Sequence, residues 1–236
     1  MATAPGGLKE GAAALGVPLD AAQLGLFARY RASLENWNLR LNLTSAAALA
    51  DIERSHFLDA LTLVPYLRTL PAGARLVDIG SGAGFPGVPL KLALPGIELA
   101  LVEATAKKAG FLRWLVNELG LSGVTVHNRR AEELARDPEL RERFDAATAR
   151  ALGALPTVLE LTLPFLRVGG VLLAQRGTDG PAEASSVTAA AEVLGGQVRA
   201  VEKAGEPRWV VLVDKVSPID LRYPRRSGMP VKYPLR

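Results

Sequence analysis

A short apolar run followed at once by three closely spaced glycines constrains the fold of this chain more than any other feature. Residues 75–87 read RLVDIGSGAGFPG, with glycines at positions 80, 82 and 84. Glycine lets the chain turn sharply and lets backbone N–H groups approach a ligand closely. The segment therefore predicts a buried strand, a tight turn and the start of a helix, an arrangement that can cradle a nucleotide-like ligand.

Strand-like and helical segments alternate after residue 74. We expect strands at 75–79, 98–102, 125–128, 146–149, 171–175, 198–202 and 209–213, and helices at 86–93, 106–119, 131–136, 155–166 and 181–194. This alternation is typical of a parallel, doubly wound sheet. Only a short link separates the last two strands, so we expect them to pair antiparallel. The predicted fold is a Rossmann-like α/β domain with a seven-stranded, mostly parallel sheet and a terminal antiparallel hairpin.

The first seventy residues carry no strand signal and read as a helical cap. Residues 1–17 predict either a short helix or a loose arm. From Asp20, a plausible N-cap, apolar residues recur every three or four positions, which predicts an amphipathic helix that ends near 42–45. A second helix is expected across 47–67, bent or broken near Pro65.

The chain as a whole then divides into three parts that form one compact unit. We expect a helical extension at 1–70, the Rossmann-like domain at 71–216, and an extended basic tail at 217–236. No apolar stretch is long enough to span a bilayer, which takes about 20 residues, and no secretory signal is evident. We therefore expect a cytoplasmic protein with no membrane contact.

Composition removes several kinds of chemistry. The chain has no cysteine, so it can form no disulfide, zinc–thiolate site or thiol nucleophile. His56 and His127 are its only histidines, so we expect no metal centre. The net charge of +4 permits a polyanionic partner without requiring one.

Acidic residues beside the glycine turn suggest a cofactor. Asp78 precedes the turn, and Glu103 closes the second strand, where a carboxylate can hold the two hydroxyls of a ribose. Two cofactor classes fit. Gly82-Ala-Gly84-Phe-Pro-Gly87 satisfies the G-x-G-x-x-G pattern, so a nicotinamide-dependent oxidoreductase stays open. The D-x-G-x-G-x-G form from Asp78, the terminal hairpin and the lack of a substrate domain favour S-adenosyl-L-methionine.

Seven separated segments together resemble one family over nearly the whole chain. They are WNLRLNLTS (37–45), HFLDAL (56–61), VDIGSGAGFPGVPL (77–90), KKAGFL (107–112), RAEEL (130–134), AR-AL (149–152) and YPRRSGMP (223–230). The family is that of the small-subunit rRNA guanine-N7 methyltransferases, formerly called glucose-inhibited division protein B. The resemblance implies the class I methyltransferase fold, S-adenosyl-L-methionine as cofactor, and 16S rRNA or an assembling small ribosomal subunit as partner. Its members methylate N7 of a guanine in the decoding region, guanine 527 in standard rRNA numbering.

The resemblance also implies a set of cofactor contacts, which fall on Gly80, Phe85, Ala131, Glu132 and Arg150. The turn and the strand ends beside it extend the expected cofactor site to Asp78, Ser81, Gly82, Gly84, Glu103 and Ala104. The chain departs from the family pattern at HFLDAL, where HFLDSL is common, and at residues 175–177, where Lys-Gly is frequent. The second departure can alter an RNA contact.

Guanine N7 carries a lone pair and no proton, so its methylation needs no general base, and alignment can supply most of the catalysis. We expect Arg150, Asn38 and Asn42 to position the base. Each has an alternative: Arg150 can be an exposed charge at a strand end, and the two asparagines can shape a helix terminus. His56 and Asp59 can form a buried pair; a small-molecule methyltransferase with His56 as base is the rival enzyme.

Basic residues outside the cofactor turn are candidates for RNA contact. Residues 221–236 contain five Lys or Arg, no acidic residue, and tyrosines able to stack on unpaired bases. We expect phosphate contacts from Arg129, Arg130, Arg176, Arg222, Arg225, Arg226 and Lys232. The same charges can simply be solvated. A non-catalytic RNA-binding protein is the remaining alternative.

Overall fold

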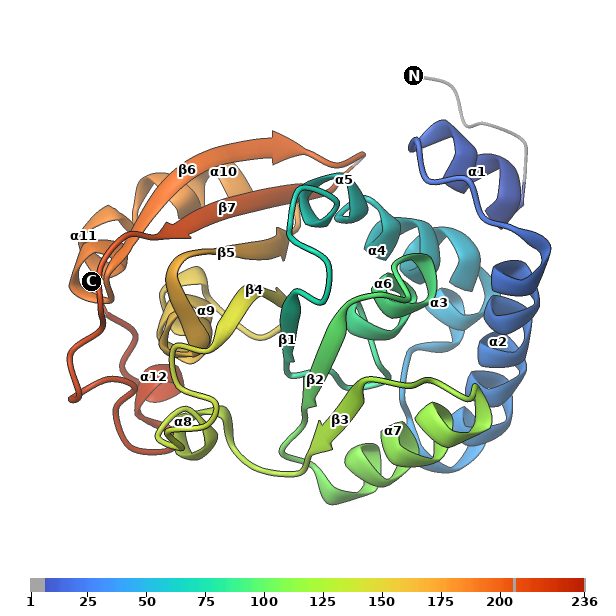
Figure 1. Cartoon of the computed structure of the whole chain (residues 1–236), viewed down its shortest axis with the longest axis horizontal. Helices are drawn as coiled ribbons and strands as arrows, with labels where there is room; N and C mark the ends of the chain where they lie inside the picture. The colour runs from blue at the N-terminus through green and yellow to red at the C-terminus, as the bar shows by residue number, and fades with distance from the viewer. Residues whose placement is uncertain (1–6, 206, 236) are drawn as a thin grey trace.

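The central strands are apolar on both faces, as buried parallel strands require. In β1 (Arg75–Ile79) and β2 (Glu98–Val102), every residue after the first is buried. The computed structural model describes residues 7–205 and 207–235 and places these strands in a seven-stranded sheet (Figure 1). The other strands are β3 (Val124–His127), β4 (Phe144–Arg150), β5 (Leu166–Arg176), β6 (Gly196–Lys203) and β7 (Trp209–Lys215).

The strand order is β3-β2-β1-β4-β5-β7-β6. β1 pairs in parallel with β2 and β4, whereas β7 runs antiparallel to both β5 and β6. The predicted mixed sheet with its terminal hairpin is therefore confirmed. From β1 the chain proceeds outward to β2 and β3, then returns to place β4 on the other side of β1. This reversal makes the carboxyl ends of β1 and β4 the expected ligand position of the sheet.

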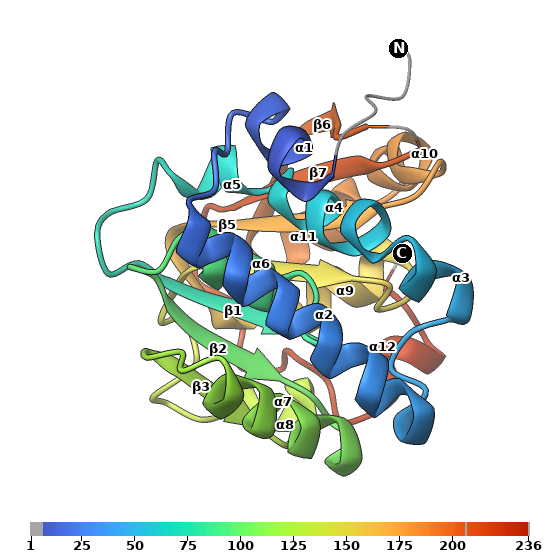
Figure 2. The same ribbon diagram turned by 90° about the vertical axis from the view of Figure 1, so that its right-hand side faces the viewer.

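Helices cover both faces of the sheet (Figures 1 and 2). One face carries α6 (Gly87–Ala93), α7 (Ala106–Glu118) and the N-terminal helices, and α2 (Ala21–Leu41) packs against both α6 and α7. The other face carries the remaining helices of the domain: α8 (Ala131–Leu134), α9 (Leu155–Thr162) with the 3-10 turn Leu163–Phe165, α10 (Gly180–Ser185) and α11 (Thr188–Val193).

The helix predicted at 181–194 is two helices, α10 and α11. Ser186, which follows α10, donates its hydroxyl to the Glu183 carbonyl at 2.8 Å, a local bond that competes with continued helix formation. The short C-terminal helix α12 (Met229–Lys232) was not expected.

The N-terminal extension contains α1 (Leu8–Ala14), α2, and a second helical segment in four pieces. These are α3 (Ala46–Ala50), the π-helical turn Glu53–Leu58, α4 (Asp59–Leu61) and α5 (Val64–Leu67). The Ser55 hydroxyl donates to the carbonyls of Ala48 and Asp51, at 2.8 and 2.7 Å, and Pro65 lies in the first turn of α5, near the predicted break. Residues 1–6 of the predicted extension, and residue 236 of the predicted tail, lie outside the described residues. The division at residues 70 and 216 stays a prediction.

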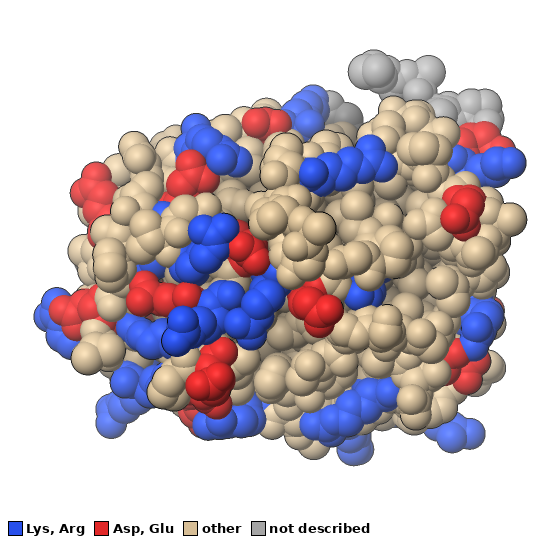
Figure 3. All heavy atoms as spheres, in the orientation of Figure 1, with Lys and Arg blue, Asp and Glu red and all other residues tan. Residues whose placement is uncertain are grey.

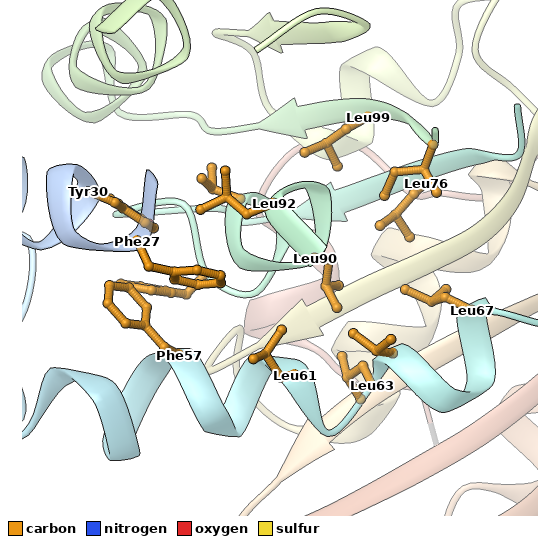
Figure 4. Close-up of a cluster of buried hydrophobic side chains, with 14 of the residues drawn as sticks. Phe27, Tyr30, Phe57, Leu61, Leu63, Leu67, Leu76, Leu90, Leu92 and Leu99 are labelled. Carbon is orange, nitrogen blue, oxygen red and sulfur yellow. The ribbon is translucent and has the colours of Figure 1, made fainter. Parts of the chain in front are cut away.

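The extension and the sheet share one hydrophobic core (Figure 4). Phe57 packs against Phe27 and Tyr30 of α2, with ring centroids 5.0 and 5.4 Å apart. Leu90 and Leu92 of α6 belong to the same cluster, between these rings and the sheet residues Leu76 and Leu99. Truncation of a buried aromatic such as Phe57 to alanine costs about 3–5 kcal/mol, so the extension is held firmly against the site that the sheet presents.

Candidate active site

The glycine turn after β1 takes a backbone path that L side chains rarely adopt. Gly80, Gly82 and Gly84 have φ values of +74°, +56° and +99°. A β-carbon on Gly80 would lie 2.6 Å from Leu152, and one on Gly84 would lie 2.7 Å from the Tyr30 hydroxyl. A β-carbon on Gly82 would meet only the Gly80 carbonyl, at 3.8 Å. The turn is therefore closed by packing at both ends and open at Gly82.

Glu103 ties the end of β2 to this turn. Its carboxylate accepts hydrogen bonds from the backbone N–H groups of Gly82, at 2.9 Å, and Thr105, at 2.6 Å. The side chain of Asn128, after β3, donates to the carbonyls of Glu103 and Ala104 at 3.0 and 3.1 Å. Hydrogen bonds to the side chain and backbone of Glu103 thus join the ends of three neighbouring strands. The position of Glu103 after the second strand had marked it in the sequence, whereas nothing in the sequence pointed to Asn128.

Asp78 faces into the protein rather than toward the open side of the turn. Its carboxylate accepts from the Thr148 hydroxyl at 3.0 Å and from the Gly87 N–H at 3.3 Å, and the residue is fully buried. Burial raises the pKa of this carboxyl from 3.8 to about 6. The Asp78 side chain therefore fastens the turn to β4 and α6, and a direct contact of this carboxyl with the cofactor stays a prediction. The Ser81 hydroxyl is likewise turned inward, donating to the Asp78 carbonyl at 2.9 Å.

Arg150, the last residue of β4, is held from three directions. Its Nη1 donates to Asp59 at 2.8 Å, its Nη2 contacts Nδ1 of His56 at 3.1 Å, and its guanidinium lies 5.0 Å from the centre of the Phe85 ring. Only 15% of its side chain is exposed. The sequence alternative of a freely exposed charge does not apply. The arginine stands beside the glycine turn, at the switch point between β1 and β4.

The same contacts define the protonation of His56. A guanidinium can only donate, so Nδ1 of His56 accepts and the ring hydrogen resides on Nε2, which lies 2.7 Å from the Thr44 hydroxyl. Burial, and then the charge of Arg150, lower the pKa of His56 from 6.5 to about 4. Both ring nitrogens are engaged, and the ring is a weak base. This geometry speaks against His56 as the base of a small-molecule methyltransferase.

The two predicted asparagines shape the end of α2. Asn38 pairs through its amide with the backbone N–H and carbonyl of Thr44, at 2.9 and 3.0 Å. Asn42 adopts a φ of +47° and ends the helix. Asn38 therefore reaches Arg150 only indirectly, through Thr44 and His56. The amide of Asn38 is thus paired within the helix terminus, as the alternative interpretation held, while Asn42 is exposed; positioning of the base by these two residues stays a prediction.

Glu132, at the start of α8, contacts a distant part of the chain. Its Oε1 accepts from the backbone N–H of Gly228 at 2.8 Å, and 4% of the residue is exposed. Its neighbour Ala131 is also buried, at 8% exposure, in the core on that side of the sheet. The C-terminal segment therefore lies directly against the predicted adenine-binding residues.

Comparison with known proteins identifies the family of the chain. A family model described as rRNA small subunit methyltransferase G matches residues 23–211. The chain belongs to this family. A relative from Dehalococcoides mccartyi (strain CBDB1), named ribosomal RNA small subunit methyltransferase G, is 43% identical over 233 residues, which cover 97% of this chain and 98% of the relative. A relative of the same name from Roseiflexus sp. (strain RS-1) is 45% identical over 228 residues, 95% of this chain and 97% of the relative.

Solved structures share the fold of this methyltransferase G family member at much lower identity. A SAM-dependent methyltransferase from Aquifex aeolicus matches with a TM-score of 0.52 and 18% identity over 67% of this chain and 93% of that one. A protein of the NADB-Rossmann superfamily from Streptococcus agalactiae matches with a TM-score of 0.52 and 18% identity, covering 69% of each chain. The predicted family and Rossmann-like methyltransferase fold are confirmed. The fold likeness by itself does not separate the two cofactor classes.

Two of the basic residues expected to contact RNA in this family member are paired inside the protein. Arg176 makes two bonds of 2.6 Å to the carboxylate of Glu183. Arg225 binds Glu160, whose side chain has no exposed surface, with its Nε at 2.9 Å and its Nη2 at 2.6 Å. Both guanidinium groups are engaged by carboxylates of the protein, half-buried Glu183 and fully buried Glu160, so a phosphate would have to compete with these pairs.

The remaining basic candidates are on the surface. Arg222 lies 3.2 Å from Asp220, and Arg129, Arg130, Arg226 and Lys232 are exposed, with no ion pair to another described residue. On the face in Figure 3, Lys and Arg side chains alternate with Asp and Glu, above all where Figure 1 places α8 and α12. RNA contact by these five residues stays a prediction.

Tyr30 of α2 is a site residue that the sequence did not single out. Its hydroxyl donates to the Ala83 carbonyl within the glycine turn at 2.5 Å, and its ring stacks on Phe85 at 5.3 Å. Burial raises its pKa well above 10.0. No local signal in the sequence predicted its contact with the turn. Among the described residues, no helix has the length and apolarity to cross a membrane, and no group of three acidic or histidine side chains is arranged for a metal.

Proposed function

We propose that this protein transfers the methyl group of S-adenosyl-L-methionine to N7 of a guanine in 16S ribosomal RNA, guanine 527 in standard numbering. The observation that carries the proposal is the meeting of Gly82, Glu103 and Arg150 at one edge of the sheet. Parallel α/β sheets bind ligands at this edge, where the strand order reverses. Family membership supports rRNA as the substrate class.

The residues at the edge suit an adenosyl ligand that carries both an amino acid and a ribose. The open backbone at Gly82 can accept the amino-acid end, and the Glu103 carboxylate retains lone pairs for ribose hydroxyls. We assign the adenine end of the cofactor to Ala131 and Glu132, at the start of α8. The bound cofactor supplies a sulfonium methyl group for transfer.

The chain's own groups fit an acceptor that needs no deprotonation. Asp78 is buried and paired with Thr148, His56 is held between Arg150 and Thr44, and burial keeps the Tyr30 hydroxyl protonated. Guanine N7 has a lone pair and loses no proton when it is methylated, unlike an exocyclic amine. The role left to the protein is to align the acceptor, with Arg150 placed to donate hydrogen bonds to the base or its phosphate.

The deciding experiment is transfer of labelled methyl groups to 16S rRNA, both as naked RNA and in small subunits, with mapping of the modified atom. We expect 7-methylguanine at one nucleotide. A label on another base atom would overturn the N7 assignment while leaving methyl transfer to rRNA intact. Transfer to a small molecule alone, with no rRNA product, would favour the rival enzyme.

Cofactor binding is tested by calorimetry with S-adenosyl-L-methionine and with NADH. We expect the first to bind and the second not to bind, and Glu103→Gln to weaken the first by about a hundredfold, since a hydrogen bond to a charged group is worth about 1.5–3 kcal/mol. Glu139→Gln, an exposed change far from the turn, is the matched control. A wild-type protein that binds neither cofactor would support a non-catalytic RNA-binding role.

A further inference from the structure

The C-terminal segment is fastened to the domain along its length rather than extended from it. Arg136 donates to the Pro224 carbonyl at 2.6 Å, and Arg141 donates to the Tyr223 carbonyl at 2.9 Å. The Thr157 hydroxyl of α9 donates to the Pro230 carbonyl at 2.9 Å. The expectation of an extended tail is therefore wrong, because side chains of the domain satisfy the backbone carbonyls of the segment.

A buried ion pair anchors this segment. Glu160 of α9 has no exposed surface, and its carboxylate accepts from the backbone N–H of Arg225 at 2.8 Å as well as from the guanidinium. The same guanidinium donates to the Tyr233 carbonyl at 2.7 Å. Arg225 thereby clamps residues 225–233 into a loop. A buried carboxylate left without its cation is strongly unfavourable, so Arg225 stays in the clamp rather than reaching for phosphate.

The clamped loop carries its middle residues to the start of α8. Gly228, with a φ of +84°, directs its N–H to Oε1 of Glu132 at 2.8 Å, and the Ser227 hydroxyl donates to Glu133 at 3.1 Å. Oε2 of Glu132 has no hydrogen-bond partner among the described residues. The loop therefore orients the Glu132 carboxylate by one oxygen and leaves the other available to a ligand.

We propose that the loop 225–233 is a positioning element of the adenosyl site, in which the Arg225–Glu160 clamp holds Gly228 against Glu132 so that this carboxylate can receive the adenine end of the cofactor. The inference rests on the proposed function, because it assumes that the ligand at this edge is adenosyl. It assigns Arg225, which was predicted to bind RNA, to the binding of the methyl donor instead. Arg226, next to the clamp but exposed and unpaired with any described carboxylate, stays available for RNA.

The test compares Arg225→Ala with its neighbour Arg226→Ala in the full chain. We expect Arg225→Ala to raise the calorimetric Kd for S-adenosyl-L-homocysteine by about tenfold, or about 1.4 kcal/mol, and to leave the Kd for a 16S rRNA fragment within about twofold. Arg226→Ala should leave the cofactor Kd unchanged. Arg225→Lys, which keeps a cation beside Glu160 without the guanidinium fork, should restore part of the cofactor affinity.

Folding is followed separately, so that a general loss of structure is not mistaken for a loss of the clamp. Where Arg225→Ala does not fold, Arg225→Lys against wild type gives the same comparison, with an expected rise of about threefold in the cofactor Kd. Unchanged cofactor affinity in a folded Arg225 variant would overturn the inference, as would a loss confined to RNA affinity. These results differ from a failure of the proposed function, in which wild type itself binds no cofactor and Glu103→Gln changes nothing.

Discussion

Arg150 contacts His56 through a hydrogen bond that exists only while the histidine is neutral. Nη2 of the arginine lies 3.1 Å from Nδ1 of the imidazole, and since the guanidinium can only donate, a protonated ring would lose this bond and repel its partner. Through this contact His56, in the π-helical turn Glu53–Leu58, orients Arg150, the last residue of β4. His56 is in this view a positioning residue for Arg150, with Thr44 holding its other nitrogen.

The first prediction tests this role with two substitutions at one position. The ring centroids of His56 and Phe85 are 4.4 Å apart, and His56→Phe keeps a ring against Phe85 but removes the nitrogen that accepts from Arg150. We expect kcat for methyl transfer to fall by about tenfold, on the order of one hydrogen bond to a charged group. His56→Gln can still accept from Arg150 and should recover most of that loss. Equal losses in both variants, or none in either, would contradict a role through the acceptor.

A second prediction concerns Gly84 and its contact with the helical extension. Gly84→Ala places a β-carbon at φ +99° and 2.7 Å from the Tyr30 hydroxyl, so we expect a loss of about 2–4 kcal/mol in the free energy of unfolding, measured with urea. Gly110 lies in α7, and a β-carbon there would meet no other atom within 4 Å. Gly110→Ala should therefore stabilise the protein by about 0.5–1 kcal/mol. Equal effects at both positions would show that the turn is not confined as described.

A third prediction follows from two pKa shifts of opposite sign. Folding raises the pKa of Asp78 to about 6, so between pH 4 and 6 the folded protein holds a proton that the unfolded chain has released, and this term lowers stability as the pH rises. Folding lowers the pKa of His56 to about 4, so between pH 4 and 6.5 the unfolded chain holds the extra proton, and this term raises stability with pH. The two terms oppose each other over the same range.

Removing either group should leave only the pH dependence of stability that the other group causes. We expect His56→Gln to lose stability relative to wild type as the pH rises from 4 to 6.5, and Asp78→Asn to gain stability relative to wild type over the same range. Each relative change should be on the order of 2 kcal/mol, from about 1.4 kcal/mol for each pKa unit. Denaturant unfolding at half-unit pH steps measures both. Stability curves parallel to that of wild type would refute the assigned shifts.

A fourth prediction tests the link between the strand ends. Asn128→Ala removes both side-chain bonds to the carbonyls of Glu103 and Ala104, which fix the backbone beside the turn. We expect the Kd for the cofactor to rise by about fivefold to tenfold, since a net hydrogen bond is worth about 0.5–1.5 kcal/mol. Asn36→Ala, an exposed change on α2, serves as the control. A Kd equal to that of wild type would show that Glu103 keeps its place without this support.

Much of the fold was predictable because the signals that define it are local. Apolar runs bounded by turn residues placed β1 and β2 at their observed bounds, and the glycines marked the turn because only glycine takes its φ values at low cost. The Asp20 cap and apolar spacing likewise located α2. The break near Pro65 was predicted, whereas the π-helical turn Glu53–Leu58 and the break between α10 and α11 were missed, because hydroxyl-to-carbonyl bonds such as that of Ser186 leave no periodic pattern.

The sequence by itself thus determined the fold class, the glycine turn and the family, all of which rest on neighbouring residues and ordered motifs. Tertiary structure alone decided the direction in which charged side chains point. It turned Asp78 into the core, paired Arg225 with Glu160 across 65 positions, and joined Glu132 to Gly228 across 96. A charge in a sequence looks the same whether it faces solvent, a ligand or a buried partner, because its pairing depends on which distant segments the packing brings together.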